Sequence, residues 1–139
     1  MATRILLVDD ERDLVFASKL YLETEGYEII PAYDGAEALE LVQDPATRPD
    51  LIILDAWMPR MSGWDALGAL RANVELRDIP VIMLTVAAQE ADKARGWELG
   101  VDWYHTKPFI PEELLAVIER VLQASKDQAE EDRARAGDG

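Results

Sequence analysis

The sequence predicts an α/β fold: a doubly wound, five-stranded parallel sheet with five helices. Short apolar runs alternate with longer stretches in which apolar residues recur every three or four positions. The first, third and fourth runs are almost wholly apolar, which is typical of central parallel strands covered on both faces. Strict alternation of strand and helix favours right-handed crossovers within one sheet. The predicted strands are Ile5–Val8, Tyr27–Ile30, Leu51–Leu54, Val81–Leu84 and Val101–Tyr104.

The helices between and after these strands are indicated by apolar residues at helical spacing. A stretch at about Gln89–Leu99 gives the weakest pattern, because it depends mostly on two alanines and one leucine. Glycines are expected to end helices, short polar side chains to cap their first turns, and proline to fit a first turn. The pattern positions are Leu14, Ala17, Tyr21, Ala38, Leu41, Val42, Leu67, Leu70, Val74, Leu114, Ile118, Val121 and Leu122, and the terminal residues are Gly26, Gly100, Asp34, Ser62 and Pro111.

The length of 139 residues fits one domain. We assign residues 1–122 to this domain, because Leu122 is the last large apolar residue of the chain. Residues 123–139 cannot add to the core, and they are a helical extension, a linker stub or a disordered tail. Their composition favours a stub or a tail, although many of these residue types are good helix formers.

Charge and composition exclude several classes of protein. The chain has 28 acidic and 14 basic residues, a formal net charge of −14, so no basic face for direct nucleic-acid binding is expected. It has no cysteine, which excludes disulfides and thiolate metal sites. No apolar run approaches the roughly 20 residues of a membrane span, and acids by position 9 argue against a signal peptide. We therefore predict a cytoplasmic protein without membrane contact.

Polar residues follow four of the five predicted strands. In a parallel α/β sheet the carboxyl ends of the strands lie at one edge, where ligands bind. Each residue alone is also explained as a helix cap, a loop acid or a surface lysine, so it is their convergence that indicates a site. They are Asp9, Asp10 and Glu11 after the first strand, Asp55 after the third, Thr85 after the fourth and Lys107 after the fifth.

Three carboxylates at one edge require a cation. At ~4 Å and an effective dielectric constant near 20, each pair repels by about 4 kcal/mol. Mg²⁺ takes oxygen ligands, usually one or two carboxylates together with phosphate oxygens, and Lys107 adds a compact positive charge. One carboxylate can then attack phosphorus while the metal, the ammonium and a hydroxyl hold the phosphoryl oxygens. Asp55 is the natural nucleophile, because it alone follows the third strand.

Four segments of the chain match one known family. They are I-L-L-V-D-D-E, L-I-I-L-D-A-W-M-P-R-M-S-G, V-I-M-L-T-V and D-W-Y-H-T-K-P-F, in the family's order. Over about Arg4–Leu122 the chain resembles the receiver domain of two-component response regulators. The resemblance implies a flavodoxin-like fold of strand order 2-1-3-4-5. It also implies a phosphorylation-dependent signalling switch that is not an enzyme beyond self-phosphotransfer and self-dephosphorylation.

The resemblance implies roles for the acids. Asp10 and Asp55 would bind Mg²⁺ through their side chains and Trp57 through its backbone carbonyl, with Asp9 beside them. Asp55 would accept a phosphoryl group from a histidine kinase or a phosphotransfer protein.

The resemblance also implies a switch. Thr85 and Lys107 would hold the phosphoryl oxygens, and Tyr104 would change rotamer as Thr85 moves. In this family the changing surface comprises the fourth helix, the fifth strand and the fifth helix, which would bind an output partner or form a homodimer. Trp103 lies there and is either an exposed interface anchor or packed against the fourth helix. The bond between Lys107 and Pro108 would be cis.

Two residues depart from the usual family pattern. Val86 is bulkier than the residue that often follows the switch hydroxyl, and it would narrow access to the phosphoryl group or alter loop closure. Trp57 is larger than usual and would shield the acyl phosphate from water, which predicts slow self-dephosphorylation. His105, the only histidine, is expected to pack or to be solvated, because one imidazole makes no metal site by itself.

Two other functions stay open at this point. A Mg²⁺-dependent aspartyl-phosphate phosphohydrolase of the haloacid dehalogenase type uses the same chemistry, but its nucleophile follows the first strand in a D-x-D pattern. A phosphorylation-independent interaction module would not need the acids, the hydroxyl and the lysine together.

Overall fold

A single parallel sheet of five strands forms the centre of the computed structural model, which describes residues 2–86 and 98–138. The strand order is β2-β1-β3-β4-β5, so the predicted topology is confirmed. Every neighbouring pair is parallel. The strands are β1 (Arg4–Val8), β2 (Glu28–Ala32), β3 (Leu51–Asp55), β4 (Val81–Thr85) and β5 (Trp103–Thr106).

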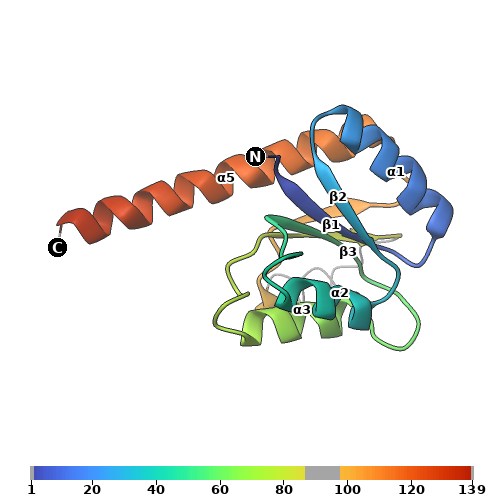
Figure 1. The fold of residues 1–139 in the computed structure, drawn as a ribbon, viewed down its shortest axis with the longest axis horizontal. Helices are drawn as coiled ribbons and strands as arrows, with labels where there is room; N and C mark the ends of the chain where they lie inside the picture. Colours follow the sequence, from blue (N-terminus) through green and yellow to red (C-terminus); the bar gives the residue numbers. More distant parts are fainter. Residues whose placement is uncertain (1, 87–97, 139) are drawn as a thin grey trace.

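Helices of the described residues cover both faces of the sheet (Figure 1). α1 and α5 lie on one face, and α2 and α3 lie on the other. The predicted helix at about Gln89–Leu99 falls almost wholly on residues 87–97, outside the described part, so four of the five predicted helices are seen. They are α1 (Arg12–Thr24), α2 (Gly35–Gln43), α3 (Gly63–Ala72) and α5 (Pro111–Asp138).

The three central strands form the middle of the core. All residues of β3 and β4 are buried, as are Ile5–Val8 of β1. Burial of each large aliphatic side chain contributes roughly 1.5–3 kcal/mol relative to exposure. Their side chains divide between an apolar cluster under α1 and α5 and another under α2 and α3. Burial on both faces is why these strands are continuous apolar runs in the sequence.

The predicted helix ends are confirmed. The Asp34 and Ser62 side chains each accept a hydrogen bond from the third backbone amide of the helix that follows, at 2.8 Å and 3.2 Å. Gly26 and Gly100 have positive φ angles of 95° and 86°, which glycine adopts at little cost. Pro111 is the first residue of α5.

Two strands begin later than their apolar runs predicted. β2 begins at Glu28, because the Tyr27 amide donates to the Leu22 carbonyl at 3.2 Å and so completes the end of α1. β5 begins at Trp103, because the Asp102 side chain first accepts a hydrogen bond from the Val81 amide at 2.8 Å. The predicted start of β5 at Val101 was therefore wrong by two residues.

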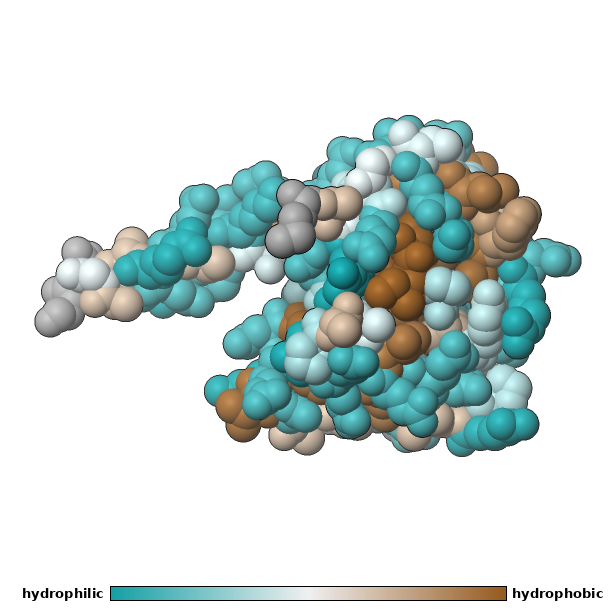
Figure 2. Space-filling model, in the orientation of Figure 1, coloured by the Kyte–Doolittle hydropathy of each residue, from teal (hydrophilic) through white to brown (hydrophobic). Residues whose placement is uncertain are grey.

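α5 projects beyond the body of the domain (Figure 1). Its 28 residues correspond to a helix about 42 Å long, and residues 123–138 continue it without a break. Figure 2 shows mainly hydrophilic colours along the projecting part. The extension is thus helical, and the domain boundary at residue 122 stays a prediction. Within residues 2–86 and 98–138, no helix has both the length and the apolar character of a membrane span.

Gly63, the first residue of α3, lies against the end of β3. A Cβ atom at this position would be 2.2 Å from the Asp55 carbonyl oxygen and 2.9 Å from the Ala56 Cα. The Gly63 amide donates to the Ala56 carbonyl at 2.9 Å. Because both neighbours are backbone atoms, only glycine allows α3 to begin this close to Asp55.

The close approach at Gly63 gives a testable prediction. Gly63→Ala is expected to lower the free energy of unfolding by about 2–3 kcal/mol, because the new methyl group meets backbone that cannot move aside cheaply. Gly68→Ala is the matched control in the same helix, since nothing lies within 4 Å of its Cβ position, and it should gain about 0.5–1 kcal/mol. Urea unfolding measures both. A Gly63→Ala protein as stable as the native one would contradict the close approach.

Candidate functional site

The acids predicted at the strand ends lie together. Asp9 and Asp10 follow β1, and Asp55 is the last residue of β3, the neighbouring strand. One carboxylate oxygen from each lies within 4.8 Å of the other two. Asp9 and Asp55 are buried, with relative exposures of 0% and 4%, whereas Asp10 is exposed. Adjacency of β1 and β3 in the sheet is what brings these distant parts of the chain to one point.

Lys107 brings a positive charge to the acids from the segment after β5. Its Nζ donates to Asp9 Oδ2 at 2.8 Å and to Glu11 Oε1 at 3.2 Å. The same atom lies 3.8 Å from Asp55 Oδ2, and the lysine side chain is 8% exposed. The peptide bond to Pro108 is cis, as the resemblance implied. The contact with Glu11 was not predicted, and its only signal in the sequence is the place of Glu11 directly after the two aspartates.

The crowded charges change the protonation of this cluster. Burial, and after it the charge of Asp9, raises the pKa of Asp55 to about 7, against the lowering effects of Lys107 and the Trp57 amide. Burial acts to lower the pKa of Lys107, but its hydrogen bond to Asp9 and the charge of Asp55 outweigh this and raise it. One ammonium therefore does not neutralise the acids.

A hard divalent cation fits these residues. The cluster offers three carboxylates, two of them buried, and carboxylate oxygens are the ligands that Mg²⁺ takes in proteins. Burial and the charge of Asp9 raise the pKa of Asp55 in spite of Lys107, so an added cation would favour its ionised form. The Trp57 amide donates to Asp55 Oδ1 at 3.4 Å, which holds the backbone of the following loop beside the carboxylate.

Thr85 and Tyr104 lie on the next two strands of the sheet. Thr85 is the last residue of β4 and is 3% exposed, and its carbonyl accepts a hydrogen bond from the Lys107 amide at 2.8 Å. Tyr104 is partly buried on the α2 and α3 face, with its ring centroid 6.2 Å from that of Trp64. This backbone hydrogen bond joins Thr85 to Lys107, which is the first residue after β5, the strand that carries Tyr104.

Exposed apolar side chains lie around the acid cluster. Trp57 is 54% exposed and Val86 is 65% exposed. Val86 therefore lines open space beside Lys107, and whether it narrows access to the site stays a prediction. The space is a hollow of about 270 Å³ lined by Glu11, Leu14, Val86, Lys107, Pro108 and Phe109.

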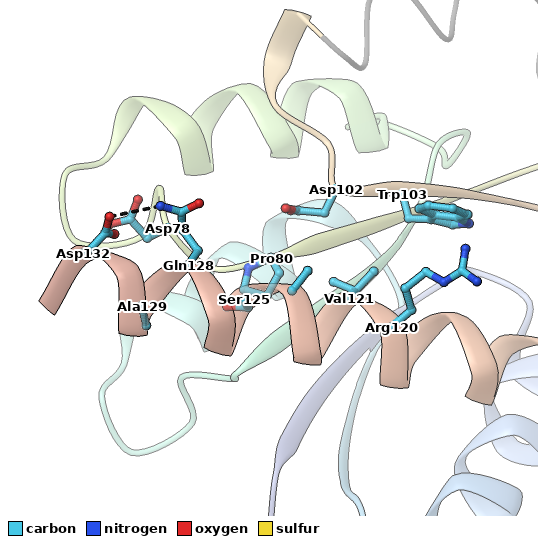
Figure 3. A pocket seen from close by; sticks show the side chains of 11 residues that line it. Asp78, Pro80, Asp102, Trp103, Arg120, Val121, Ser125, Gln128, Ala129 and Asp132 are labelled. Carbon is cyan, nitrogen blue, oxygen red and sulfur yellow. Dashed lines mark hydrogen bonds between the residues drawn. The ribbon is translucent and has the colours of Figure 1, made fainter. Parts of the chain in front are cut away.

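Trp103 lies on the face of the sheet opposite to Tyr104. It packs against the apolar cluster under α1 and α5, and the Arg120 guanidinium lies 5.2 Å from its ring centroid. Trp103 lines a groove of about 690 Å³ together with residues of α5. Figure 3 shows it between α5 and the sheet, with Asp102 and Arg120 nearby. Trp103 is thus partly buried rather than a fully exposed anchor. The alternative contact with the fourth helix involves residues outside the described ranges.

Comparison with known sequences finds receiver domains. The family model of the response regulator receiver domain matches residues 5–119. The chain is 46% identical over 122 residues to the transcriptional regulatory protein CpxR of Escherichia coli (strain K12), covering 88% of this chain and 50% of CpxR. It is 40% identical over 126 residues to the alkaline phosphatase synthesis transcriptional regulatory protein PhoP of Bacillus subtilis (strain 168), covering 91% and 51%. The chain spans about half the length of the curated relatives it matches.

Comparison with solved structures gives the same fold. The chemotaxis protein CheY4 of Vibrio cholerae has a TM-score of 0.82 at 35% identity, covering 87% of this chain and 99% of that chain. NtrX of Brucella abortus has a TM-score of 0.87 at 31% identity, covering 97% and 30%. Both likenesses extend over most of this chain.

Proposed function

The chain belongs to the response regulator receiver family of two-component signalling, and on this premise we propose that it is a phosphorylation-dependent switch acting in the cytoplasm. Asp55 accepts a phosphoryl group from a histidine kinase or a phosphotransfer protein. The observation that carries the proposal is the buried ion cluster, in which Lys107 Nζ lies 2.8 Å from Asp9 and 3.8 Å from Asp55. Related response regulators are signalling proteins, and this chain's own chemistry is limited to self-phosphotransfer and self-dephosphorylation.

The acids hold the metal. Asp10 and Asp55 would hold Mg²⁺ through their carboxylates and Trp57 through its backbone carbonyl, while Asp9 is hydrogen-bonded to Lys107. When bound, Mg²⁺ supplies neutralising charge for the phosphoryl oxygens. The attack requires an ionised carboxylate, but the pKa of Asp55 is raised to about 7 without a cation. A cation beside Asp55 would favour the ionised form.

The transfer uses the remaining residues of the cluster. A carboxylate oxygen of Asp55 attacks phosphorus, and the bond from phosphorus to the donor imidazole nitrogen breaks with its electron pair left on the imidazole. The Lys107 ammonium and the Thr85 hydroxyl hold the phosphoryl oxygens. Their support is the Lys107 geometry above and the position of Thr85 at the end of β4.

The signal leaves through the surface that includes β5 and α5. As Thr85 moves toward the phosphoryl group, Tyr104 changes rotamer, which biases a two-state element. The groove that holds Trp103 and Arg120 lies on this surface (Figure 3) and receives an output partner or a second copy of the chain. Two curated relatives are named transcriptional regulatory proteins. These names do not support our expectation that nucleic acid is not a partner, so it is no part of the proposal.

Phosphoryl uptake tests the proposal. Intact-mass analysis after incubation with acetyl phosphate and Mg²⁺ should show one added phosphoryl group on the native protein and none on Asp55→Asn. Asp65→Asn, which alters an exposed aspartate on α3, is the control that should still take up the group, and chelation by EDTA should abolish uptake. An unmodified native protein would contradict the switch. Steady release of phosphate from a phosphomonoester would favour the phosphohydrolase instead.

The lifetime of the phosphoryl group tests the role of Trp57. We propose that the indole shields the acyl phosphate, supported by its size and by the Trp57 amide contact with Asp55 at 3.4 Å. Trp57→Ala should shorten the half-life by about threefold or more, a barrier change of roughly 0.7 kcal/mol. Val74→Ala removes another exposed apolar side chain and should leave the half-life unchanged. Equal half-lives in Trp57→Ala and native protein would rule out the shield.

A further inference from the structure

His105 is the only histidine of the chain, and its Nε2 atom is buried without a hydrogen-bond partner among the described residues. It lies in β5, in register with Leu84 of β4. Its ring packs on Phe109, with centroids 5.2 Å apart and planes at 55°. A neutral imidazole fits this position, whereas an imidazolium would bury an N–H⁺ donor that has no acceptor.

The contact between His105 and Phe109 brackets Lys107. Each ring belongs to a residue two positions from the lysine, and Phe109 lines the same hollow as Lys107. The distances from Nζ to Asp9 (2.8 Å) and Asp55 (3.8 Å) depend on where this short segment lies. Packing of the two rings fixes the segment on both sides of the lysine.

The charged groups near the imidazole make the contact sensitive to protons. Burial lowers the pKa of His105, and the charge of Glu113 on α5 acts in the opposite direction. Along the chain, the charged groups on either side of His105 are Lys107, which donates to Glu11 at 3.2 Å, and Asp102, which accepts from Arg71 at 3.2 Å. A neutral ring therefore suits the contact with Phe109, whereas a protonated ring would be attracted toward Glu113.

We propose that His105 is a positioning residue for Lys107, and that protonation of its ring releases the segment after β5 and slows phosphoryl uptake at Asp55. The inference rests on the proposed function, but it adds an input that the Thr85 and Tyr104 movement does not use. The neutral ring, packed on Phe109, keeps the ammonium within reach of Asp9 and Asp55. Proton concentration would then set how much of the protein is competent to accept a phosphoryl group.

Nuclear magnetic resonance tests the ring directly. Because the chain has one histidine, its imidazole signals are unambiguous. We expect a midpoint below the ordinary value of about 6.5, and we expect the backbone amide signals of Lys107 and Phe109 to shift with the same midpoint. A midpoint at or above the ordinary value, or amide signals that do not follow the ring, would overturn the proposal. This outcome does not depend on phosphoryl uptake.

Kinetics test the consequence. His105→Leu places an apolar side chain that does not titrate in the same space. Phosphoryl uptake from acetyl phosphate and Mg²⁺ is measured for both proteins against pH. Because Asp55 titrates in both, the ratio of the two uptake rates reports the effect of His105 protonation alone. One pH unit below the ring's midpoint about one tenth of native rings are neutral. The variant should then be faster by up to about tenfold, and within about twofold of native at pH 8.

The other results of the kinetic experiment separate the role of His105 from the proposed function. A ratio of uptake rates between His105→Leu and native protein that stays constant across the pH range would contradict the proposal. No uptake by either protein at pH 8 would count against the proposed function, and the resonance measurement would still decide the role of His105. The resonance measurement also decides alone should His105→Leu fail to fold.

Discussion

Crowded negative charge at the end of a buried sheet is the constraint on which this structure depends. Asp9 and Asp55 are almost fully buried, and burial of ionised acids is costly unless other charges compensate them. Lys107 compensates in part, since it is bonded to Asp9 and close to Asp55. Burial, and after it the charge of Asp9, still raises the pKa of Asp55 to about 7, and this unfavourable charge supports our proposal of a cation and a phosphoryl group at the site.

The sheet connects this cluster to the surface through β5. Tyr104 faces the side of α2 and α3, whereas Trp103 packs on the side of α1 and α5, because successive side chains of a strand point to opposite faces. The segment that follows β5 carries Lys107 into the acids. β5 and the segment after it therefore reach the charge cluster, Tyr104 and the groove beside α5, which is a short path for the switch that we propose.

The sequence predicted the parts that depend on order along the chain. β1, β3 and β4 are apolar runs because both of their faces are covered, and Asp9, Asp10 and Asp55 meet because carboxyl ends of parallel strands share an edge. For residues 123–138 the sequence left a helical extension, a linker stub and a disordered tail open, since a segment with no core contacts gives no apolar pattern. The packing of His105 on Phe109 was not predicted, because it depends on the path of the segment after β5.

The free energy of unfolding of native protein and Asp55→Asn, followed against pH with EDTA and with Mg²⁺, tests the central claim most directly. Because the pKa of Asp55 is raised to about 7, the folded state binds more protons than the unfolded state between pH 4 and 7, roughly, and native stability with EDTA should fall as pH rises. Asp55→Asn should remove this fall of stability with pH, and above pH 7 it should be more stable than the native protein by on the order of 2 kcal/mol. Mg²⁺ should restore the stability that the native protein loses at high pH. Native stability that responds to neither pH, Mg²⁺ nor the substitution would contradict the account.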